Sequence, residues 1–304
     1  MMGDVKKSGT NAEATMSIGA LSRATDIPVN TIRTWERRYG YPEAHRTESG
    51  HRLYRPDLVS DLRLVARALS SGFRPRQVLG RSVDDLRSMV GQSIRKTATS
   101  STDGVDTQAW MDAVSSFDAQ ALTTGFRSVV AQHGLMSFCS EYAPTFLTKV
   151  GLAWQEGQIE IHHEHFGSEV LRDFLVSQWR PLSLQSDGPV IVCGTLPAER
   201  HQMGLHLAAC VFAALGNKVI FLGADTPLES LTATVVDSDA SILVISSSVF
   251  APPEETLKRL KSLRLAISST VEIWVGGGGA SSTINGVTFI DTIRDLAALV
   301  ANRS

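Results

Sequence analysis

The sequence contains little cysteine and no long apolar run. Its 304 residues include three cysteines, Cys139, Cys193 and Cys210, which lie far apart and form no CxxC pair. That spacing argues against a disulfide framework and against a zinc site built from cysteines. No run of about eighteen apolar residues exists, and the first residues lack the apolar segment of a signal peptide. We therefore expect a soluble, cytoplasmic protein with reduced cysteines and no membrane segment.

Charge is nearly balanced overall but unevenly distributed. The formal net charge is −2, yet residues 1–100 hold 17 Lys and Arg against 10 Asp and Glu, and the remaining residues hold 12 against 21. Hydrophobic residues make up 43% of the chain, which is enough for two or three packed domains. A basic amino-terminal part joined to an acidic body indicates that one end of the protein binds a polyanion.

Two short helices separated by a tight turn are predicted near the amino terminus. Apolar residues recur at helical spacing over residues 18–24 and 32–39, Ser17 is placed to cap the first helix, and Asp26-Ile27-Pro28 interrupts the pattern. The outer face of the second helix then carries Asn30, Arg33, Thr34 and Arg37. The amino-terminal end of such a face fits the major groove of DNA.

A basic loop follows these helices. Gly50 is predicted to turn between two short extended segments, and Arg46, His51, Arg52 and Arg55 lie around it. Such a wing suits contacts to phosphate groups. A further helix is predicted from Pro56-Asp57 to about Gly72. The alternative is a small helical domain whose basic face is simply solvated.

The segments IGALSRATDIPVNTIRTWERRYG and RTESGHRLYRPDLVSDLRLV resemble the winged helix-turn-helix of MerR-type transcription regulators over about residues 16–82. The ending WERRYG is similar to the subgroup whose effector domain binds cobalamin. The resemblance implies a disordered segment at residues 1–15, a DNA-binding domain at 16–95 and operator DNA as a partner. It implies DNA contacts by Asn30, Arg33, Thr34, Arg37, Arg38, Arg46, His51, Arg52 and Tyr54.

The rest of the chain divides into a linker, a helical part and an alternating part. Residues 96–106 are polar and resemble a linker, and apolar residues at three- and four-residue steps predict a four-helix bundle over 107–185. Over residues 188–304, short apolar runs (PVIVCGTL, KVIFLG, SILVISSSV, VEIWVGG and VTFID) alternate with helical stretches. This alternation predicts a Rossmann-like, flavodoxin-like parallel sheet, so the expected fold class is multidomain α plus α/β.

Ligands of a parallel sheet lie beyond the carboxyl ends of its strands, where the strand order reverses. Here those ends carry small residues, at 194–204, 246–248 and 276–279. A dinucleotide site is disfavoured because GTLPAERHQMG lacks the G-x-G-x-x-G spacing. A receiver domain is disfavoured because serines stand where a phosphorylatable aspartate is required.

The segment ERHQMG, residues 199–204, resembles the D/E-x-H-x-x-G motif of cobalamin-binding domains. The resemblance implies that His201 is the lower axial ligand of cobalt and that Glu199 fixes its tautomer. It also implies that the nucleotide tail of the cofactor passes a set of small residues, namely Gly204, Ser246, Ser247, Ser248, Gly276, Gly277 and Gly278. The alternative for a histidine at a helix start is a cap or a surface position.

The segment WQEGQIEIHHEH, residues 154–165, spans a helix end near Gly157 and a second helix expected from about Ile161 through Leu175. Its W-x9-E-H spacing resembles light-responsive cobalamin regulators of the CarH and LitR kind. The resemblance implies that Trp154 caps the 5′-deoxyadenosyl group, that Glu164 hydrogen-bonds to it and that His165 lies beside them. Two alternatives are a core tryptophan and a zinc site that includes His162 and His165.

One residue departs from that family's pattern. A histidine that can ligate cobalt after photolysis directly follows the motif tryptophan in the family, whereas Gln155 stands there in this sequence. After photolysis, cobalt would then either keep water or recruit His162, His163 or His165. A protein that responds to cobalamin without using light is a further possibility.

The resemblance implies a transcriptional repressor rather than an enzyme. In the dark, adenosylcobalamin would assemble a homotetramer that binds operator DNA through several DNA-binding domains at once. Light would dissociate this tetramer. Methyl- and hydroxocobalamin are the other forms of the cofactor to consider. Two alternatives remain: a light-independent sensor of cobalamin level or redox state, and a corrinoid protein of a methyltransferase system.

Overall fold

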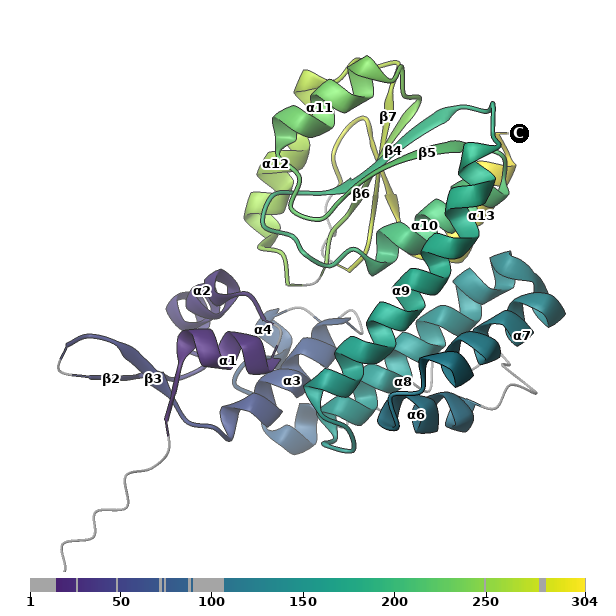
Figure 1. Cartoon of the computed structure of the whole chain (residues 1–304). Helices are drawn as coiled ribbons and strands as arrows, with labels where there is room; N and C mark the ends of the chain where they lie inside the picture. Colours follow the sequence, from purple (N-terminus) through teal and green to yellow (C-terminus); the bar gives the residue numbers. More distant parts are fainter. Residues whose placement is uncertain are drawn as a thin grey trace, which may run out of the picture.

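The computed structural model describes residues 15–25, 27–47, 49–70, 73, 75–86, 89, 107–248, 250–278 and 283–303, without the side chains of residues 67, 70 and 155. The segments expected to be disordered (1–15) and to form a linker (96–106) lie outside these residues, except for Thr15. Figure 1 shows three parts, which we call the head (residues 15–89), the bundle (107–185) and the sheet domain (188–303).

The head contains the predicted helix-turn-helix and wing. Its helices are α1 (Ile18–Thr25), α2 (Val29–Tyr39), α3 (Leu58–Ser70) and α4 (Pro75–Val78). Its strands β1 (Met16–Ser17), β2 (His45–Arg46) and β3 (Arg52–Tyr54) form an antiparallel sheet in the order β1-β3-β2. Ser17 caps α1 as predicted, because its hydroxyl accepts a hydrogen bond from Ala20 N at 3.2 Å. Gly40 (φ 71°) ends α2 in the left-handed region.

The bundle is formed by α6 (Thr107–Ser115), α7 (Ala119–Ser137), the π-helical turn η1 (Phe138–Tyr142), α8 (Ala143–Gln155) and α9 (Ile161–Leu184). Edge-to-face rings of Phe126, Phe138 and Phe146 fill its core. Helix α9 is longer than predicted, because its last turns pack on the sheet domain. There Ser183 Oγ accepts a hydrogen bond from Val219 N at 2.8 Å.

The sheet domain has the predicted parallel α/β architecture. Its strands are β4 (Val190–Thr195), β5 (Lys218–Gly223), β6 (Ile242–Ser246), β7 (Glu272–Gly276) and β8 (Val287–Ile290), in the order β5-β4-β6-β7-β8. Helices α10 (Met203–Ala214) and α13 (Ile293–Ala301) pack with α9 on one face of the sheet. Helices α11 (Leu228–Asp237) and α12 (Pro253–Ala266) cover the other face. The strand order reverses between β4 and β6, so a ligand site is expected at their carboxyl ends.

None of the helices in the described ranges is long and apolar enough to cross a membrane.

Candidate functional site

Glu199, His201 and Ser248 form a hydrogen-bonded group at the carboxyl ends of β4 and β6. The Oε1 atom of Glu199 accepts from His201 N at 2.9 Å and lies 2.7 Å from His201 Nδ1. Its Oε2 atom accepts from Ser248 N at 2.8 Å and from Ser248 Oγ at 2.7 Å. A single carboxylate therefore fixes the ring of His201 and ties two loops together.

The charge of this carboxylate is stabilised where it lies. Glu199 is only 6% exposed, and burial alone would raise its pKa. The hydrogen bond and charge of His201, together with the hydrogen bond of Ser248, outweigh burial and lower the pKa to about 2. An ionised Glu199 beside Nδ1 keeps the proton on that nitrogen, so Nε2 is the ring nitrogen that would bind a metal ion.

The loop that carries Glu199 is held by side chains at the end of β4 and just after β5. Ala198 has a left-handed φ of 64°, and its N donates to Asp225 Oδ1 at 2.6 Å. The Thr195 hydroxyl donates to the Glu199 carbonyl at 2.6 Å and accepts from Asp225 N at 2.9 Å. These hydrogen bonds fix the conformation of the loop after β4, which carries His201.

Several of the small residues predicted to line the cofactor's tail lie close to one another near the carboxyl ends of β6 and β7. A Cβ at Gly204 would lie 3.0 Å from Ser246 Oγ, and one at Gly277 (φ 95°) would lie 2.4 Å from the Ser247 carbonyl oxygen. Ser246 pairs with Gly276 across β6 and β7. Ser247 Oγ is buried and has no hydrogen-bond partner among the described residues. Glycine is therefore needed here for space, and a buried hydroxyl remains for a polar ligand.

Trp154 and Glu164 lie in the bundle, at the end of α8 and the start of α9. Trp154 is 7% exposed, and its Nε1 is buried without a hydrogen-bond partner in the part of the chain that the structure describes. Glu164 Oε1 accepts from Ser168 Oγ at 2.7 Å, and Oε2 lies 2.7 Å from His165 Nδ1. The structure thus gives Glu164 two local partners and leaves the indole N–H of Trp154 without one among the described residues.

The histidines between these residues have structural roles. His163 Nδ1 accepts from Glu160 N at 3.1 Å within a capping box that begins α9. The rings of His162 and His163 stack on Phe117 at 5.7 Å and 4.6 Å between centroids. Within the described ranges, no group of three or more His, Cys, Asp or Glu is placed to hold a metal ion. The side chain of Gln155 lies outside the described residues.

Both groups of residues fit cobalamin on the chemistry of their donors. The fixed imidazole of His201 supplies a nitrogen ligand, which suits cobalt. Gly204 and Gly277, which leave no room for a side chain, and the Ser247 hydroxyl, which has no partner among the described residues, suit a polar tail that passes close to the backbone. The unsatisfied indole N–H of Trp154 suits a large ligand that carries hydrogen-bond acceptors.

Most residues predicted to contact DNA are exposed in the head. Asn30, Arg33, Arg37 and Arg38 on α2, and Arg46 and His51 on the wing, are exposed. Thr34 is half-buried, and its hydroxyl donates to the Asn30 carbonyl at 2.8 Å. Arg52 Nε donates to Glu36 Oε2 at 2.7 Å, which fixes the wing against α2.

The prediction for Tyr54 is corrected by the structure. Its side chain is fully buried in the core of the head, and its hydroxyl lies 3.4 Å from Glu36 Oε2. Burial, followed by the charge of Glu36, raises the pKa of Tyr54 to about 12. A buried side chain of this kind stabilises the wing and does not reach DNA.

Two residues at this site were not predicted from the sequence. The Phe250 ring lies 5.2 Å from the His201 ring, and the Arg63 guanidinium lies 4.3 Å from the centre of the Trp154 ring. An aromatic residue just after the serine run was the available signal for Phe250. Arg63 lies among the apolar residues of α3 and offered none.

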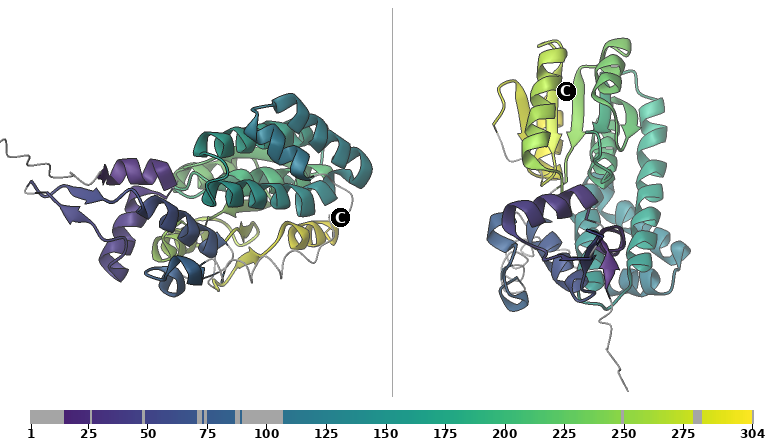
Figure 2. Two further views of the ribbon diagram at one scale, coloured as in Figure 1. Left: turned by 90° about the horizontal axis from the view of Figure 1, so that it is seen from below. Right: turned by 90° about the vertical axis from the view of Figure 1, so that its left-hand side faces the viewer.

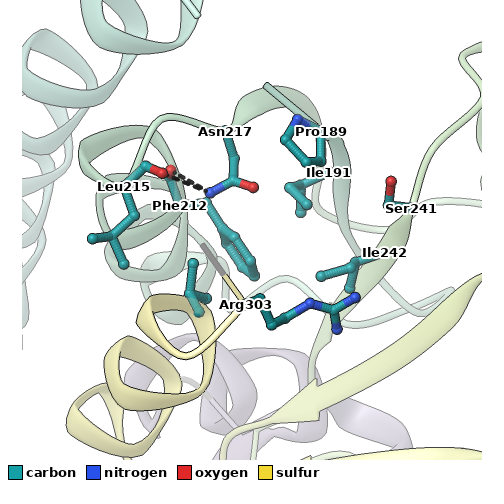
Figure 3. A pocket seen from close by; sticks show the side chains of 9 residues that line it. Pro189, Ile191, Phe212, Leu215, Asn217, Ser241, Ile242 and Arg303 are labelled. Atoms are coloured by element: carbon teal, nitrogen blue, oxygen red, sulfur yellow. Dashed lines mark hydrogen bonds between the residues drawn. The ribbon is translucent and has the colours of Figure 1, made fainter. Parts of the chain in front are cut away.

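A separate pocket of about 390 Å³ lies at the opposite, amino-terminal edge of the sheet (Figure 3). It is lined by Pro189, Ile191, Phe212, Leu215, Asn217, Ser241, Ile242, Val300 and Arg303. The Asn217 amide donates to the carbonyls of Phe212 at 3.0 Å and Leu215 at 3.3 Å. The pocket is mostly apolar and contains none of the predicted site residues.

Comparison with known proteins finds similarity to transcription regulators. Residues 16–79 match the family of MerR HTH family regulatory proteins. The HTH-type transcriptional repressor CarH of Myxococcus xanthus is 27% identical over 277 residues, which cover 89% of this chain and 91% of that protein. The repressor CarA of the same organism is 24% identical over 291 residues, or 94% and 96%. A corrinoid protein of Desulfitobacterium hafniense is 29% identical over 140 residues, or 43% and 64%.

Proposed function

We infer that this chain, which carries a MerR-type helix-turn-helix domain and is homologous to the repressors CarH and CarA, is a cobalamin-binding transcriptional repressor. The relatives that span most of its length are transcriptional regulators and not enzymes. The observation that supports cofactor binding best is the hydrogen bond of 2.7 Å between Glu199 Oε1 and His201 Nδ1. This hydrogen bond favours the tautomer and the ring orientation that a metal-ligating imidazole requires.

The proposed cofactor site has a lower and an upper part. His201 would ligate cobalt, and the nucleotide tail would lie along Gly204, Ser246, Ser247, Ser248, Gly276, Gly277 and Gly278. Trp154, with Glu164 and His165, would cover the upper ligand, for which we propose 5′-deoxyadenosyl. Bound adenosylcobalamin supplies a cobalt–carbon bond that light can cleave.

We propose that loss of the upper ligand is the signal. A group that packs on Trp154 and accepts its indole N–H would leave behind a cavity and an unsatisfied donor when it departs. The bundle would then shift and weaken a homotetramer assembled in the dark. Operator DNA bound by several heads at once would be released, because each head alone binds weakly.

The Gln155 position shapes the expected photoproduct. His163 caps α9, and His165 lies 2.7 Å from Glu164, so recruitment of either ring to cobalt would break an existing hydrogen bond. Recruitment of His162 would give up its stacking on Phe117, 5.7 Å away between centroids, so we propose that none of the three histidines would replace the missing one. A repressor that responds to cobalamin level without light is the second candidate function, and the glutamine at this position favours it.

Reconstitution tests the proposal. The full chain is mixed with adenosylcobalamin in the dark, and the absorption spectrum and the size-exclusion mass are recorded before and after green light. His201→Ala is expected to change the spectrum of the bound cofactor, whereas His133→Ala, an exposed histidine of α7, serves as the control. No cobalamin uptake by the wild type would refute the proposed function.

Light dependence is tested by the same samples on DNA. Binding to operator DNA that is lost on illumination supports the photoreceptor. Equal binding in dark and light, with cobalamin still required, supports the light-independent sensor instead.

A further inference from the structure

The head is packed against the bundle through Arg63 and Trp154. The Arg63 guanidinium lies over the Trp154 ring at 4.3 Å from its centre, and its Nε and Nη2 atoms donate to the Ala24 carbonyl at 3.3 Å and 3.2 Å. Trp154 belongs to the hydrophobic core of the bundle and is 7% exposed. One side of the indole therefore faces the bundle core, and a side chain of the head lies over the ring.

The head also contacts the loop beside His201. Thr31 Oγ1 of α2 donates to the Phe250 carbonyl at 2.8 Å, and Phe250 packs against the hydrophobic core of the head. The other neighbour of Phe250 is the ring of His201, 5.2 Å away between centroids. At the edge of this contact, Arg38 Nη1 lies 3.0 Å from Glu254 Oε1 of α12. The views in Figure 2 show the head lying against the rest of the protein from two further directions.

These contacts lie on the two side chains that the proposed function assigns to the cofactor. We propose that the docked head is an autoinhibited arrangement that competes with cobalamin for Trp154 and for the surface beside His201. This inference rests on the proposed function. A nucleoside that stacks on the side of Trp154 that Arg63 covers needs the position of the Arg63 guanidinium, because the other side of the indole faces the bundle core.

Docking also restricts the DNA-binding helix. Thr31 and Arg38 lie one above the other on α2, seven residues apart, on the flank next to its exposed arginine face. In the docked arrangement Arg38 is paired with Glu254, and Glu255 lies in the same helix turn. Carboxylates beside α2 repel DNA phosphates, so the docked head binds DNA less well than a released head.

Cobalamin and DNA therefore both favour the released head. Two ligands that prefer the same state strengthen each other's binding, and reciprocity requires the coupling to act in both directions. The apparent affinity for cobalamin falls as the docked fraction of molecules rises, because only molecules with a released head bind the cofactor in full. Weakening the docking contacts should consequently tighten cobalamin binding, even at residues remote from the cofactor.

A charge swap at Arg38 and Glu254 tests this competition in the full chain. The dissociation constant for adenosylcobalamin is measured by absorption titration in the dark for Arg38→Glu, Glu254→Arg and the double variant. We expect each single variant to bind about two- to fivefold more tightly than wild type, and the double variant to return to wild-type affinity. Glu229→Arg is the control, since it makes the same charge change at an exposed site on α11.

A distance measurement tests the movement itself. The three native cysteines are buried, so Ser49→Cys in the head and Ser262→Cys on α12 can carry a pair of nitroxide spin labels, whose separation is measured in the dark by pulsed electron paramagnetic resonance. Saturating adenosylcobalamin is expected to lengthen the distance between the labels. Thr31→Val, which removes the hydrogen bond to Phe250 without a change of shape, should increase the share of long distances before cobalamin is added.

The outcomes separate the two proposals. Cobalamin uptake with an unchanged distance between the labels, or with equal affinities in all charge variants, would overturn the competition and leave the proposed function standing. Failure of the wild type to take up cobalamin at all would overturn both.

Discussion

The Glu199 carboxylate offers a quantitative test of the site. In Glu199→Gln the side chain keeps its size, but its NH₂ group faces hydrogen-bond donors of His201 or Ser248. A pKa lowered from 4.5 to about 2 corresponds to about 3 kcal/mol of preference for the charged form, at about 1.4 kcal/mol per pKa unit. Since the amide oxygen retains part of the hydrogen bonding, we expect the variant to lose about 2 kcal/mol of unfolding free energy at pH 7.

The dependence of this loss on pH follows from the direction of the pKa change. A carboxylate with a lowered pKa in the folded state stabilises the protein above its unfolded pKa, and this stabilisation disappears as the pH falls from about 4.5 to about 2. Urea unfolding followed by circular dichroism should therefore show wild type and variant converging across that interval. Glu229→Gln on the surface of α11 is the control. A difference that stays constant between pH 7 and pH 3 would refute this account of Glu199.

Other substitutions test the DNA surface and the packing. Arg33→Ala should weaken DNA binding and lower the dependence of log affinity on log salt by about 1, as measured by fluorescence anisotropy at several salt concentrations. Gly277→Ala should abolish cobalamin uptake, or destabilise the sheet domain by about 1–3 kcal/mol in urea unfolding, because its Cβ would lie 2.4 Å from the Ser247 carbonyl oxygen. Gly125→Ala should lower the unfolding free energy of the bundle by about 1–3 kcal/mol, because the new Cβ would lie 2.4 Å from Trp110 Nε1. An unchanged salt dependence in Arg33→Ala would contradict the first expectation. Unchanged cobalamin uptake together with unchanged stability in Gly277→Ala would contradict the second, and an unchanged unfolding free energy in Gly125→Ala would contradict the third.

Elements with a strong local pattern were predictable from the sequence. Strands β4, β6 and β7 are runs of buried β-branched and apolar residues, and the edge strands β5 and β8 are partly buried apolar runs. The alternation of these runs with helices made the parallel architecture predictable. The helix-turn-helix was equally visible, because the cap at Ser17 and the break before α2 are local signals. The group around His201 was found through the ERHQMG motif, whose residues are close together in the chain.

Features that depend on distant contacts were missed. Strand β1 has two residues and exists because Met16 and Ser17 pair with β3, some 37 residues further on. The outward placement of Tyr54 failed because its burial depends on packing against α2 and α3, which no short period encodes. Arg63 and Phe250 acquire their roles only when the head meets the rest of the protein. Such contacts are set by tertiary structure and leave no mark in local sequence.

Helix α9 runs from the Trp154 end of the bundle to the sheet domain. It spans 24 residues, or about 36 Å, from the capping box at Glu160 to the hydrogen bonds between Ser183 and β5. Its proline, Pro181, lies in the last turns beside the sheet domain, so a displacement near Trp154 is absorbed there or at the turn before α9. That turn contains Gly157, whose φ of 71° makes it the natural pivot. In the proposed function, the length of this helix would turn a small movement beside Trp154 into a rotation of the bundle.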